Sequence, residues 1–425
     1  LLAWTCLLLP TVLFGLIPLL RLFSGVRIVG HDAGGLLTPE TGEIIVRTLA
    51  LGLLVACMAT AAGVYFGYRL GTKQWRGRSP SIAFLLLPLT VSPYILALGW
   101  TMLFRADGPL SRLLGVFGIH SSVAPEIIYS FPGAVAVLSL AFFPITLAFV
   151  IKACSMVSPA LLETAQVFGA NRRQAFLVAY WPFIRPSAMA SAAVIFLLTI
   201  ADLGVPTLLK VPVFNFEVFT QLSAFNNVNA ALVLTLPLLL CGLIAASLLG
   251  KVLAEQVRRD IQDLERPPSA ARNETVANAL LAVILLTVTL LLPLGSIAGG
   301  GLSTAAMSKM ARLALQPALN TLWYAGFAAA GTVIVALLLA WTVREGHERL
   351  KRLTRAIFMA GFAIPGTITA LALIPLFTNG GFAQWCPAAA LVVAALYVRY
   401  QVLAFEVVNA SSVSYTHLRA HETVL

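Results

Sequence analysis

The sequence predicts an all-α protein that crosses a membrane many times and consists of two fused copies of one six-helix unit. Of the 425 residues, 59% are hydrophobic and only 11% are charged, whereas an ordinary soluble domain is about one quarter charged. Apolar stretches long enough to cross a bilayer recur along the chain, and short motifs near them repeat. The net charge of +11 then reflects where Lys and Arg lie around a bilayer, so no nucleic acid partner is expected.

About ten apolar stretches approach or exceed the roughly 20 residues that a transmembrane helix needs. We place these predicted spans at 1–22, 44–69, 82–104, 128–151, 187–209, 230–251, 276–297, 319–343, 356–378 and 387–408. The first copy takes six spans, and the second copy shows only four. The first stretch lacks the basic start of a signal peptide, and no initiator Met is present, so we expect the natural N-terminus to lie upstream.

Basic residues concentrate in alternate connections between the spans. If the connection from Arg69 to Arg78 is cytoplasmic, strict alternation places most of the 28 basic residues on that side. They include the runs within 152–185, 251–272 and 344–355, together with Arg399. This bias is the one that the positive-inside rule describes. The connection between the fourth and fifth spans is therefore predicted to be cytoplasmic.

Two pairs of motifs indicate an internal repeat. Arg47-Thr48-Leu49 has a counterpart in Asn320-Thr321-Leu322, and Ser92-Pro93 has one in Ile364-Pro365. Both copies enter the bilayer with the same predicted sidedness, which fits a parallel duplication.

The repeat and the polar stretches between apolar segments predict the domain boundaries. A polar, charged segment that contains Pro267-Pro268 is typical of a linker. The apolar pattern ends after Asn409, so the second copy is expected to be truncated and followed by a non-native, adapter-like tail. The predicted parts are a first transmembrane domain at 1–254, a cytoplasmic linker at 255–275, a second, truncated domain at 276–409 and the tail at 410–425.

The connection between the fourth and fifth spans carries the most specific motif of the chain. It reads Glu163-Thr164-Ala165, then Gly169, then a polar and basic run, and finally Trp181-Pro182. Residues 160–166 favour a helix, and Gly169 permits a sharp turn before a second helix near Asn171. Glu163 suits the positive end of the first helix and could pair with Arg172 or Arg173 across the turn.

This spacing resembles the EAA coupling loop of binding-protein-dependent ABC import permeases, with Thr164 in place of an Ala and Trp181 in place of a Leu. The resemblance implies a type I importer subunit, multi-pass in the bacterial inner membrane, whose loop docks on an ATPase. By this resemblance Glu163 and Ala165 belong to the docking helix, Gly169 makes the turn, and Pro182 marks re-entry into the membrane. The predicted ATPase-coupling residues also include Thr164, Arg172 and Arg173. The implied partners are a separate ABC ATPase, expected as a dimer, and a periplasmic or lipid-anchored solute-binding protein.

Several alternatives stand beside this interpretation. No GxxxxGK[ST] phosphate loop occurs, so ATP belongs to a partner subunit, and the chain is expected to be neither an enzyme nor a holder of a cofactor. No metal site is expected, because the five cysteines are scattered and form no CxxC pair. The loop could also belong to another transporter, above all a secondary carrier driven by an ion gradient, since those folds use internal repeats and broken helices.

Three residues are candidates for the transport pathway. Asp202 lies in an apolar span, where a carboxylate costs at least about 2.5 kcal/mol unless it faces a polar cavity. The alternative is that Asp202 caps the helix break introduced by Gly204 and Pro206. Pro93 and Pro365 occupy equivalent places in the two copies and are candidate hinges, or static kinks.

The cargo is predicted from resemblance alone. The segment 202–206, followed by 216–221, resembles the fused two-copy permeases that import iron(III), and less closely those for thiamine or aminoethylphosphonate. Iron(III) is therefore the expected cargo, with thiamine, aminoethylphosphonate or another small solute as alternatives.

Overall fold

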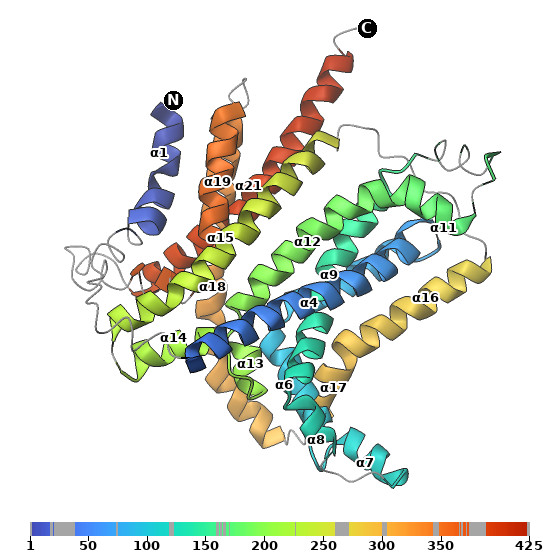
Figure 1. Cartoon of the computed structure of the whole chain (residues 1–425), viewed down its shortest axis with the longest axis vertical. Coiled ribbons are helices and arrows are strands. Elements are labelled where there is room, and N and C mark those ends of the chain that lie inside the picture. Colours follow the sequence, from blue (N-terminus) through green and yellow to red (C-terminus); the bar gives the residue numbers. More distant parts are fainter. Residues whose placement is uncertain are drawn as a thin grey trace. The chain divides into compact units, whose positions relative to one another are not determined.

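The structure of the chain is a computed structural model in which all the regular structure of the described residues is helical (Figure 1). The described residues are 2–17, 20, 39–73, 75–118, 123–158, 161, 164, 167–169, 171–225, 227–259, 272–299, 304–342, 348–364, 366, 369–370, 372–373 and 388–422. The all-α prediction is confirmed for this part of the chain. Helices suit such an apolar sequence because they satisfy every backbone polar group without water.

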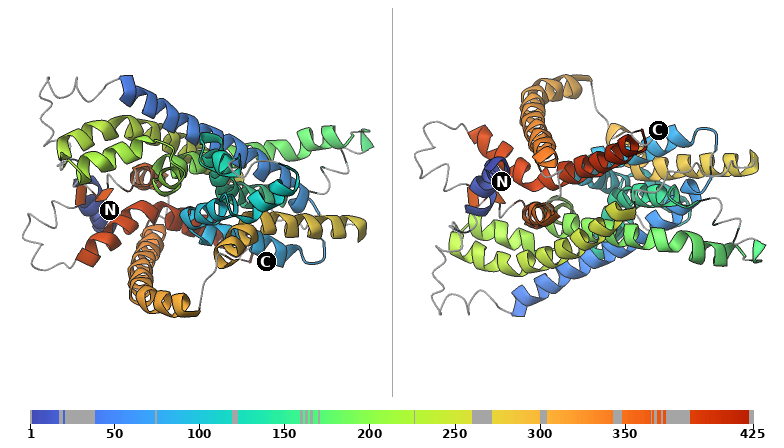
Figure 2. Two further views of the ribbon diagram at one scale, coloured as in Figure 1. Left: turned by 90° about the horizontal axis from the view of Figure 1, so that it is seen from below. Right: turned by 90° about the horizontal axis from the view of Figure 1, so that it is seen from above.

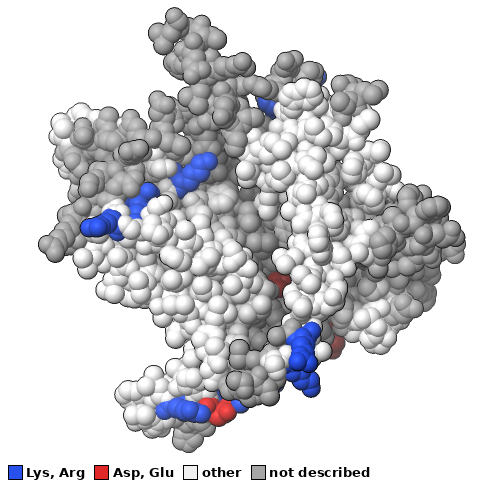
Figure 3. All heavy atoms as spheres, turned by 180° about the vertical axis from the view of Figure 1, so that it is seen from behind, with Lys and Arg blue, Asp and Glu red and all other residues white. Residues whose placement is uncertain are grey.

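Six helices in the described part are long and apolar enough to cross a membrane, and a seventh span results if one bent pair is counted as one. The six are Pro39–Gly71, Phe131–Cys154, Arg173–Ala201, Glu274–Gly299, Arg312–Thr342 and Ala389–Val408, and the bent pair is Arg78–Thr90 with Pro93–Leu103. Large apolar side chains are exposed on them, including Leu322 and Trp341, and most of the described surface in Figure 3 is uncharged. These surfaces fit contact with lipid.

The ten predicted spans are not shown. Two of them correspond to shorter apolar helices, Trp4–Leu16 and Val233–Ala245, and the predicted span at 356–378 falls partly outside the described residues. The span predicted at 187–209 is displaced, because the helix begins before Pro182 and ends at Ala201. A proline in the first turn of a helix does not interrupt it, so the helix runs through Pro182 and begins ahead of the predicted span.

The chain forms two compact units, each made of segments that are distant in sequence. Unit 1 comprises 1–43, 214–251 and 303–425, and unit 2 comprises 44–213 and 252–302. The first helix therefore belongs to the unit that holds the second copy, and the first helix of the second copy belongs to the unit that holds the first. Each predicted domain is one continuous stretch of sequence, whereas each compact unit combines distant segments. The predicted domain boundaries stay a prediction.

Unit 2 is built around the helices of the first copy. Its helices are α4 (Pro39–Gly71, from Ile44 onward), α5 (Arg78–Leu86), η2 (Leu87–Thr90), α6 (Pro93–Leu103), α7 (Pro109–Val116), α8 (Val123–Ile128), α9 (Phe131–Cys154), α11 (Arg172–Ala175), η3 (Phe176–Tyr180), α12 (Trp181–Ala201), α13 (Gly204–Leu208), α16 (Arg272–Leu286), η4 (Thr287–Leu291) and α17 (Leu292–Gly299). Helices α9 and α12 pack side by side (Figures 1 and 2). Helix α16 packs on α5, and α17 packs on α6.

Close backbone approach holds the centre of unit 2 together. A Cβ atom on Gly63 would lie 2.4 Å from Thr146 Cβ, and one on Gly67 would lie 2.8 Å from Val150 Cβ. Helices α4 and α9 therefore meet along a stripe of small residues, as small-xxx-small motifs allow in membranes. A Cβ on Gly99 would lie 2.2 Å from the carbonyl oxygen of Pro293, which brings α6 equally close to α17.

Unit 1 combines helices of the second copy with the first helix and the last two helices of the first copy. Its helices are α1 (Leu2–Thr11), η1 (Val12–Leu16), α14 (Phe214–Ser223), α15 (Val228–Arg259, up to Lys251), α18 (Thr304–Thr342), α19 (Glu348–Ala363) and α21 (Ala388–Glu422). Helix α21 packs on α18 and α19, and α1 packs on α18. Helix α21 continues into the predicted tail at 410–425. That this tail is non-native stays a prediction.

The π-helical turns give further support to the internal repeat. The first helical segment of each copy is followed by one such turn, Val12–Leu16 in the first copy and Thr287–Leu291 in the second. Their spacing along the chain is close to that of the motif pairs found in the sequence. Because π-turns are rare, their recurrence at matching positions indicates that the two copies share a local backbone design.

Candidate coupling loop and transport pathway

The predicted coupling loop lies between α9 and α12, and the structure describes part of it. Glu163 and Ala165 fall outside the described residues, as does the side chain of Arg172. Thr164 accepts a backbone hydrogen bond from Phe168 at 3.1 Å, as in a helical turn. The docking role of these residues and of Arg173, which is exposed, stays a prediction.

Gly169 makes the turn between the two halves of the loop. Its φ is +75°, in the left-handed region that favours glycine. The next helix begins immediately afterwards with a reciprocal cap: Gln174 N–H donates to Asn171 Oδ1, and Asn171 N–H donates to Gln174 Oε1, both at 2.9 Å. Such a capping box satisfies two backbone donors that a helix start would leave free. The turn and the helix start are thus where the sequence places them.

The apex of this loop exposes two large apolar side chains. Val167 and Phe168 are 84% and 85% exposed, although they lie in a polar and basic connection. An exposed aromatic residue at the tip of a loop is the kind of anchor that dominates protein interfaces. Sequence reasoning missed these two residues, and the signal was available, because Val167-Phe168 is an apolar pair directly before the turn glycine.

The base of the loop is a packed aromatic and apolar cluster. Tyr68 of α4 packs edge-on against Phe176 and Tyr180, with ring centroids 4.9 and 5.2 Å apart. Cys154 and Ile184 are buried in the same cluster. The loop is therefore fixed to three helices of unit 2, so a force applied to it would reach α4, α9 and α12 together.

Pro182 lies within a continuous helix, and its role as the point of re-entry into the membrane stays a prediction. The helix is continuous from Arg172 through η3 to Ala201, and Pro182 lies in the first turn of α12. The π-turn before it places the N–H of Trp181 on the carbonyl of Phe176. Because proline has no N–H and clashes with the preceding turn, a widened turn accommodates it without a break.

Asp202 lies where α12 ends and α13 begins. Its carboxylate accepts backbone hydrogen bonds from Gly204 at 3.2 Å and from Val205 at 3.4 Å, so it caps α13. This geometry is the capping arrangement that the sequence left as the alternative to a pathway role. A Cβ on Gly204 would lie 3.1 Å from Tyr94 Cδ2, so the Asp202 break meets the start of α6.

Pro93 begins α6 directly after a bend of 90° in the helix pair. Two of the three predicted pathway residues, Pro93 and Asp202, are thus brought to one place in unit 2. Pro365 falls outside the described residues, while its neighbour Gly366 is described. Two features therefore meet in unit 2: the bend before α6 and the break between α12 and α13 that Asp202 caps.

Unit 1 contains charged residues inside its helix packing that sequence reasoning missed. Arg355 of α19 donates to both carboxylate oxygens of Glu406 on α21, through Nε to Oε1 and through Nη2 to Oε2 at 3.0 Å. Each side chain is only 13% exposed. Both Glu406 and Arg399 lie within the candidate span Ala389–Val408.

The cytoplasmic placement of Arg399 stays a prediction, and the structure adds that this residue lies inside a helix long enough to span a membrane. Arg399 lies near the middle of the candidate span Ala389–Val408, about 15 Å along the helix from either end. An arginine at such a depth costs about 2.5–3.5 kcal/mol on insertion scales, which makes it a functional candidate by default. The positive-inside rule counts basic residues in the connections between spans, whereas Arg399 lies inside a span.

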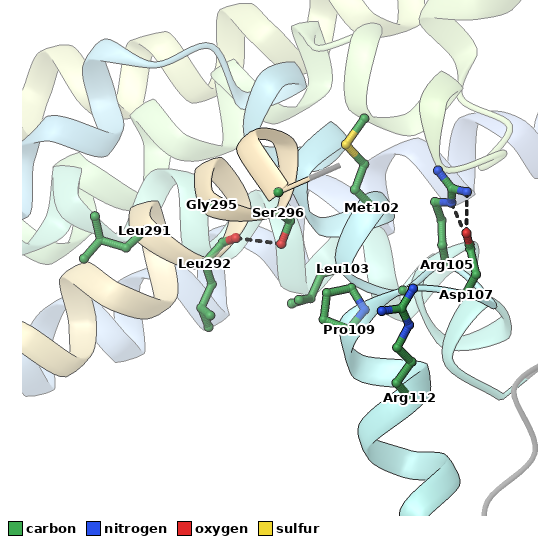
Figure 4. Close-up of a pocket in the computed structure, with 12 residues that line it drawn as sticks. Met102, Leu103, Arg105, Asp107, Pro109, Arg112, Leu291, Leu292, Gly295 and Ser296 are labelled. Atoms are coloured by element: carbon green, nitrogen blue, oxygen red, sulfur yellow. Dashed lines mark hydrogen bonds and ion pairs between the residues drawn. The ribbon is translucent and has the colours of Figure 1, made fainter. Parts of the chain in front are cut away.

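A cavity of about 580 Å³ lies between the end of α6, the start of α7 and α17 (Figure 4). Arg105 donates to both oxygens of Asp107, at 3.0 and 2.8 Å, and this hydrogen bonding lowers the pKa of Asp107 below its ordinary value. Arg112 and Ser296 also line the cavity. Its volume is within the range of small-molecule sites, and it lies in a connection predicted to face away from the cytoplasm.

No group of three or more His, Cys, Asp or Glu side chains that could hold a metal ion occurs within the described ranges. Asp202 and Glu406 belong to different compact units and each has other partners.

Comparisons with known proteins place the chain among transport permeases. No family model matches. The chain is 26% identical over 367 residues to FbpB 1 of Haemophilus influenzae, named as a ferric transport system permease protein, with 79% of this chain and 56% of the relative covered. It is 25% identical over 367 residues to the ferric transport system permease protein FbpB of Actinobacillus pleuropneumoniae, with 79% and 52% covered.

A third relative, the inner membrane ABC transporter permease protein YdcU of Escherichia coli, is 26% identical over 226 residues, with 50% of this chain and 72% of the relative covered. The chain spans about half the length of the two ferric relatives. All three matches are distant, and all three are named as permeases. The chain is thus similar to ABC transporter permeases, and its similarity to the ferric transport permeases is distant.

Proposed function

We propose that this chain is the membrane subunit of an ABC importer, which forms the translocation pathway and is driven by a separate ATPase. The observation that best supports this proposal is the geometry of the loop between α9 and α12. Its apolar apex at Val167 and Phe168 is exposed, its turn is fixed by the left-handed Gly169, and its base is packed against three helices. A rigid projection of this kind suits docking into a groove on an ATPase dimer.

The continuous helix from Arg172 to Ala201 links this loop to the break at Asp202. ATP binding by the partner would move the loop, and α12 would transmit the movement to the place where Asp202 meets α6. The bend at Pro93 is the second half of that gate. In this mechanism the chain itself binds no nucleotide.

The remaining partners and the cargo are part of the same proposal. A periplasmic or lipid-anchored solute-binding protein delivers the cargo, and the assembly lies in the bacterial inner membrane. Iron(III) is the proposed cargo, supported by the names of two relatives. Thiamine, aminoethylphosphonate or another small solute is the alternative within the same class of transporter.

Two glycines provide a matched test of the coupling loop. Gly169 and Gly118 have φ of +75° and +76°, and a Cβ on either would meet nothing within 4 Å. A valine at either position should therefore suffer the same left-handed strain, about 1–2 kcal/mol. We expect Gly169→Val to reduce co-purification of the ATPase and uptake of radiolabelled iron(III) by at least about ten-fold, and Gly118→Val to leave co-purification unchanged.

Equal ATPase co-purification by both variants would contradict docking at this loop. An uptake assay in cells without the ATPase distinguishes an ABC importer from a carrier driven by an ion gradient. Uptake that persists there and collapses with an uncoupler would support a carrier driven by an ion gradient.

A further inference from the structure

Arg399 carries an unsatisfied hydrogen-bond donor inside unit 1. Its Nε is buried and has no hydrogen-bond partner in the described part of the chain. The nearest ring is that of Tyr400, whose centroid lies 5.9 Å from Cζ. Buried polar groups in native structures are nearly always paired, so an unpaired one suggests a missing partner.

The guanidinium fills a notch left by a glycine. A Cβ on Gly366 would lie 2.6 Å from Arg399 Nη1 and 3.8 Å from Cζ, so an alanine at this position would require the guanidinium to move. Gly366 follows Pro365, the counterpart of Pro93 at the 90° bend of the other copy. Arg399 therefore lies beside the equivalent segment of the second copy, where a break in a span is expected to line a cavity.

The positive charge of Arg399 is not neutralised by the acidic residue in its own helix. Glu406 already binds Arg355 through both carboxylate oxygens. The polar neighbours on α21 are also engaged elsewhere: Thr11 donates to Gln401 Oε1 at 2.7 Å, and its hydroxyl lies 3.5 Å from the Tyr397 hydroxyl. Among the described residues, no carboxylate forms an ion pair with Arg399.

We propose that Arg399 is an anion-binding residue of the transport pathway, and that the cargo passes it as an oxyanion or as iron(III) enclosed by oxyanions. The inference rests on the proposed function, because it takes unit 1 to line the pathway. A guanidinium offers a planar pair of donors that matches carboxylate and phosphate oxygens. Arginine and lysine side chains similarly select anions in pores, whereas a bare iron(III) ion would be repelled.

The experiment measures anion binding to the purified full-length chain in lipid nanodiscs by titration calorimetry at constant ionic strength. The probes are sodium phosphate, sodium citrate and ferric citrate. We expect saturable binding by the wild type and at least about ten-fold weaker binding by Arg399→Gln. The matched control is Arg349→Gln, which removes an exposed arginine of the same unit at the start of α19 and should bind like the wild type.

The probes distinguish the two sources of the oxyanion. Binding of phosphate or citrate alone supports an oxyanion cargo, and binding of ferric citrate alone supports iron(III) carried within an anion. Binding of no probe to the wild type, or equal binding by the wild type and Arg399→Gln, overturns the proposal. A merely structural arginine would lower the stability of Arg399→Gln without changing the affinity for any probe.

Two further variants keep the test decisive if Arg399→Gln does not fold. Arg399→Lys keeps the positive charge and loses the planar pair of donors, so we expect several-fold weaker binding of the anion. Gly366→Ala keeps the arginine and displaces its guanidinium, so it should also weaken binding, and wild-type affinity in both variants would overturn the proposal. ATPase co-purification by the Arg399 variants should match the wild type, which separates this outcome from a failure of the coupling loop.

Discussion

Unit 1 and unit 2 hold related sets of helices, and different interactions stabilise their interiors. In unit 2, α4 and α9 meet through Gly63 and Gly67, where backbone lies almost against side chain. The repeat aligns these glycines with Ala336 and Ala340 of α18, which are also buried. The extra methyl groups exclude, at these two positions of α18, an approach as close as the one at Gly63. Close approach in unit 1 occurs elsewhere, at Gly361 of α19, where a Cβ would lie 2.8 Å from the carbonyl oxygen of Val398.

Unit 1 contains a buried ion pair as well as buried or half-buried hydrogen bonds. These contacts are the ion pair of Arg355 with Glu406, the hydrogen bond of Thr11 with Gln401, and the bond from Trp4 Nε1 to Thr354 Oγ1 at 2.9 Å. In unit 2, the buried hydrogen bond from Thr146 to Ser191 joins two uncharged side chains. The comparison teaches that two related units can differ in the charge that they bury, and the unit with the buried ion pair also contains Arg399.

Breaking the buried ion pair of unit 1 should have the largest effect on stability. Glu406→Ala leaves the Arg355 charge without its partner at a site where each side chain is 13% exposed. We expect a loss of about 3–5 kcal/mol in the free energy of unfolding, measured by denaturant titration of the protein in mixed micelles.

The control replaces both members of the pair. The double variant Arg355→Met, Glu406→Leu removes the charges together and should be close to wild type, because apolar residues of similar volume can replace a buried pair. A loss below about 1 kcal/mol for Glu406→Ala alone would show that unit 1 does not depend on its polar interior.

Adding one methyl group to the glycine stripe of unit 2 should have an intermediate effect. In Gly63→Ala the new Cβ would lie 2.4 Å from Thr146 Cβ and 3.0 Å from the backbone N of Leu147. Helices α4 and α9 must separate, and overpacking of this kind costs about 1–3 kcal/mol. The measurement is again the free energy of unfolding in mixed micelles.

Gly326→Ala in α18 is the matched control for this substitution. A Cβ at Gly326 meets nothing within 4 Å, so it should be neutral or stabilise the helix by up to about 1 kcal/mol. Equal losses for both variants would mean that glycine in these helices serves flexibility, and the comparison of the two units would lose its basis.

The fold could be predicted from sequence where local physics decides it. Apolar length and the turn glycine gave the long helices and the left-handed turn at Gly169. The exchange of first helices between units could not be predicted, because which copy a helix packs against depends on contacts far along the chain. Residues such as Gly99 and Pro293 show that contact only after folding.

The candidate site was predicted unevenly for a related reason. The sequence left Asp202 with two possible roles, a pathway residue or a helix cap, because it shows only that a carboxylate lies near a helix break. The hydrogen bonds that Asp202 accepts from Gly204 and Val205 show that it caps a helix. Arg399 was missed although it stands inside a predicted span. Counting basic residues by connection discards such positions, while the cost of burying a charge should have singled this one out.

The ion pair of unit 2 should contribute least, and it completes the comparison. Lys73 Nζ lies 2.7 Å from Glu274 Oε2, where the exchanged helix α16 meets the connection before α5, and the two side chains are 40% and 28% exposed. Solvent screens a pair of this exposure, so Lys73→Ala should lower the free energy of unfolding by at most about 1 kcal/mol. The loss should shrink further at high salt, whereas the loss for Glu406→Ala should change little. If Lys73→Ala cost as much as Glu406→Ala, the exchanged helix of unit 2 would depend on charge as strongly as unit 1 does, and a buried ion pair would not be what distinguishes the two units.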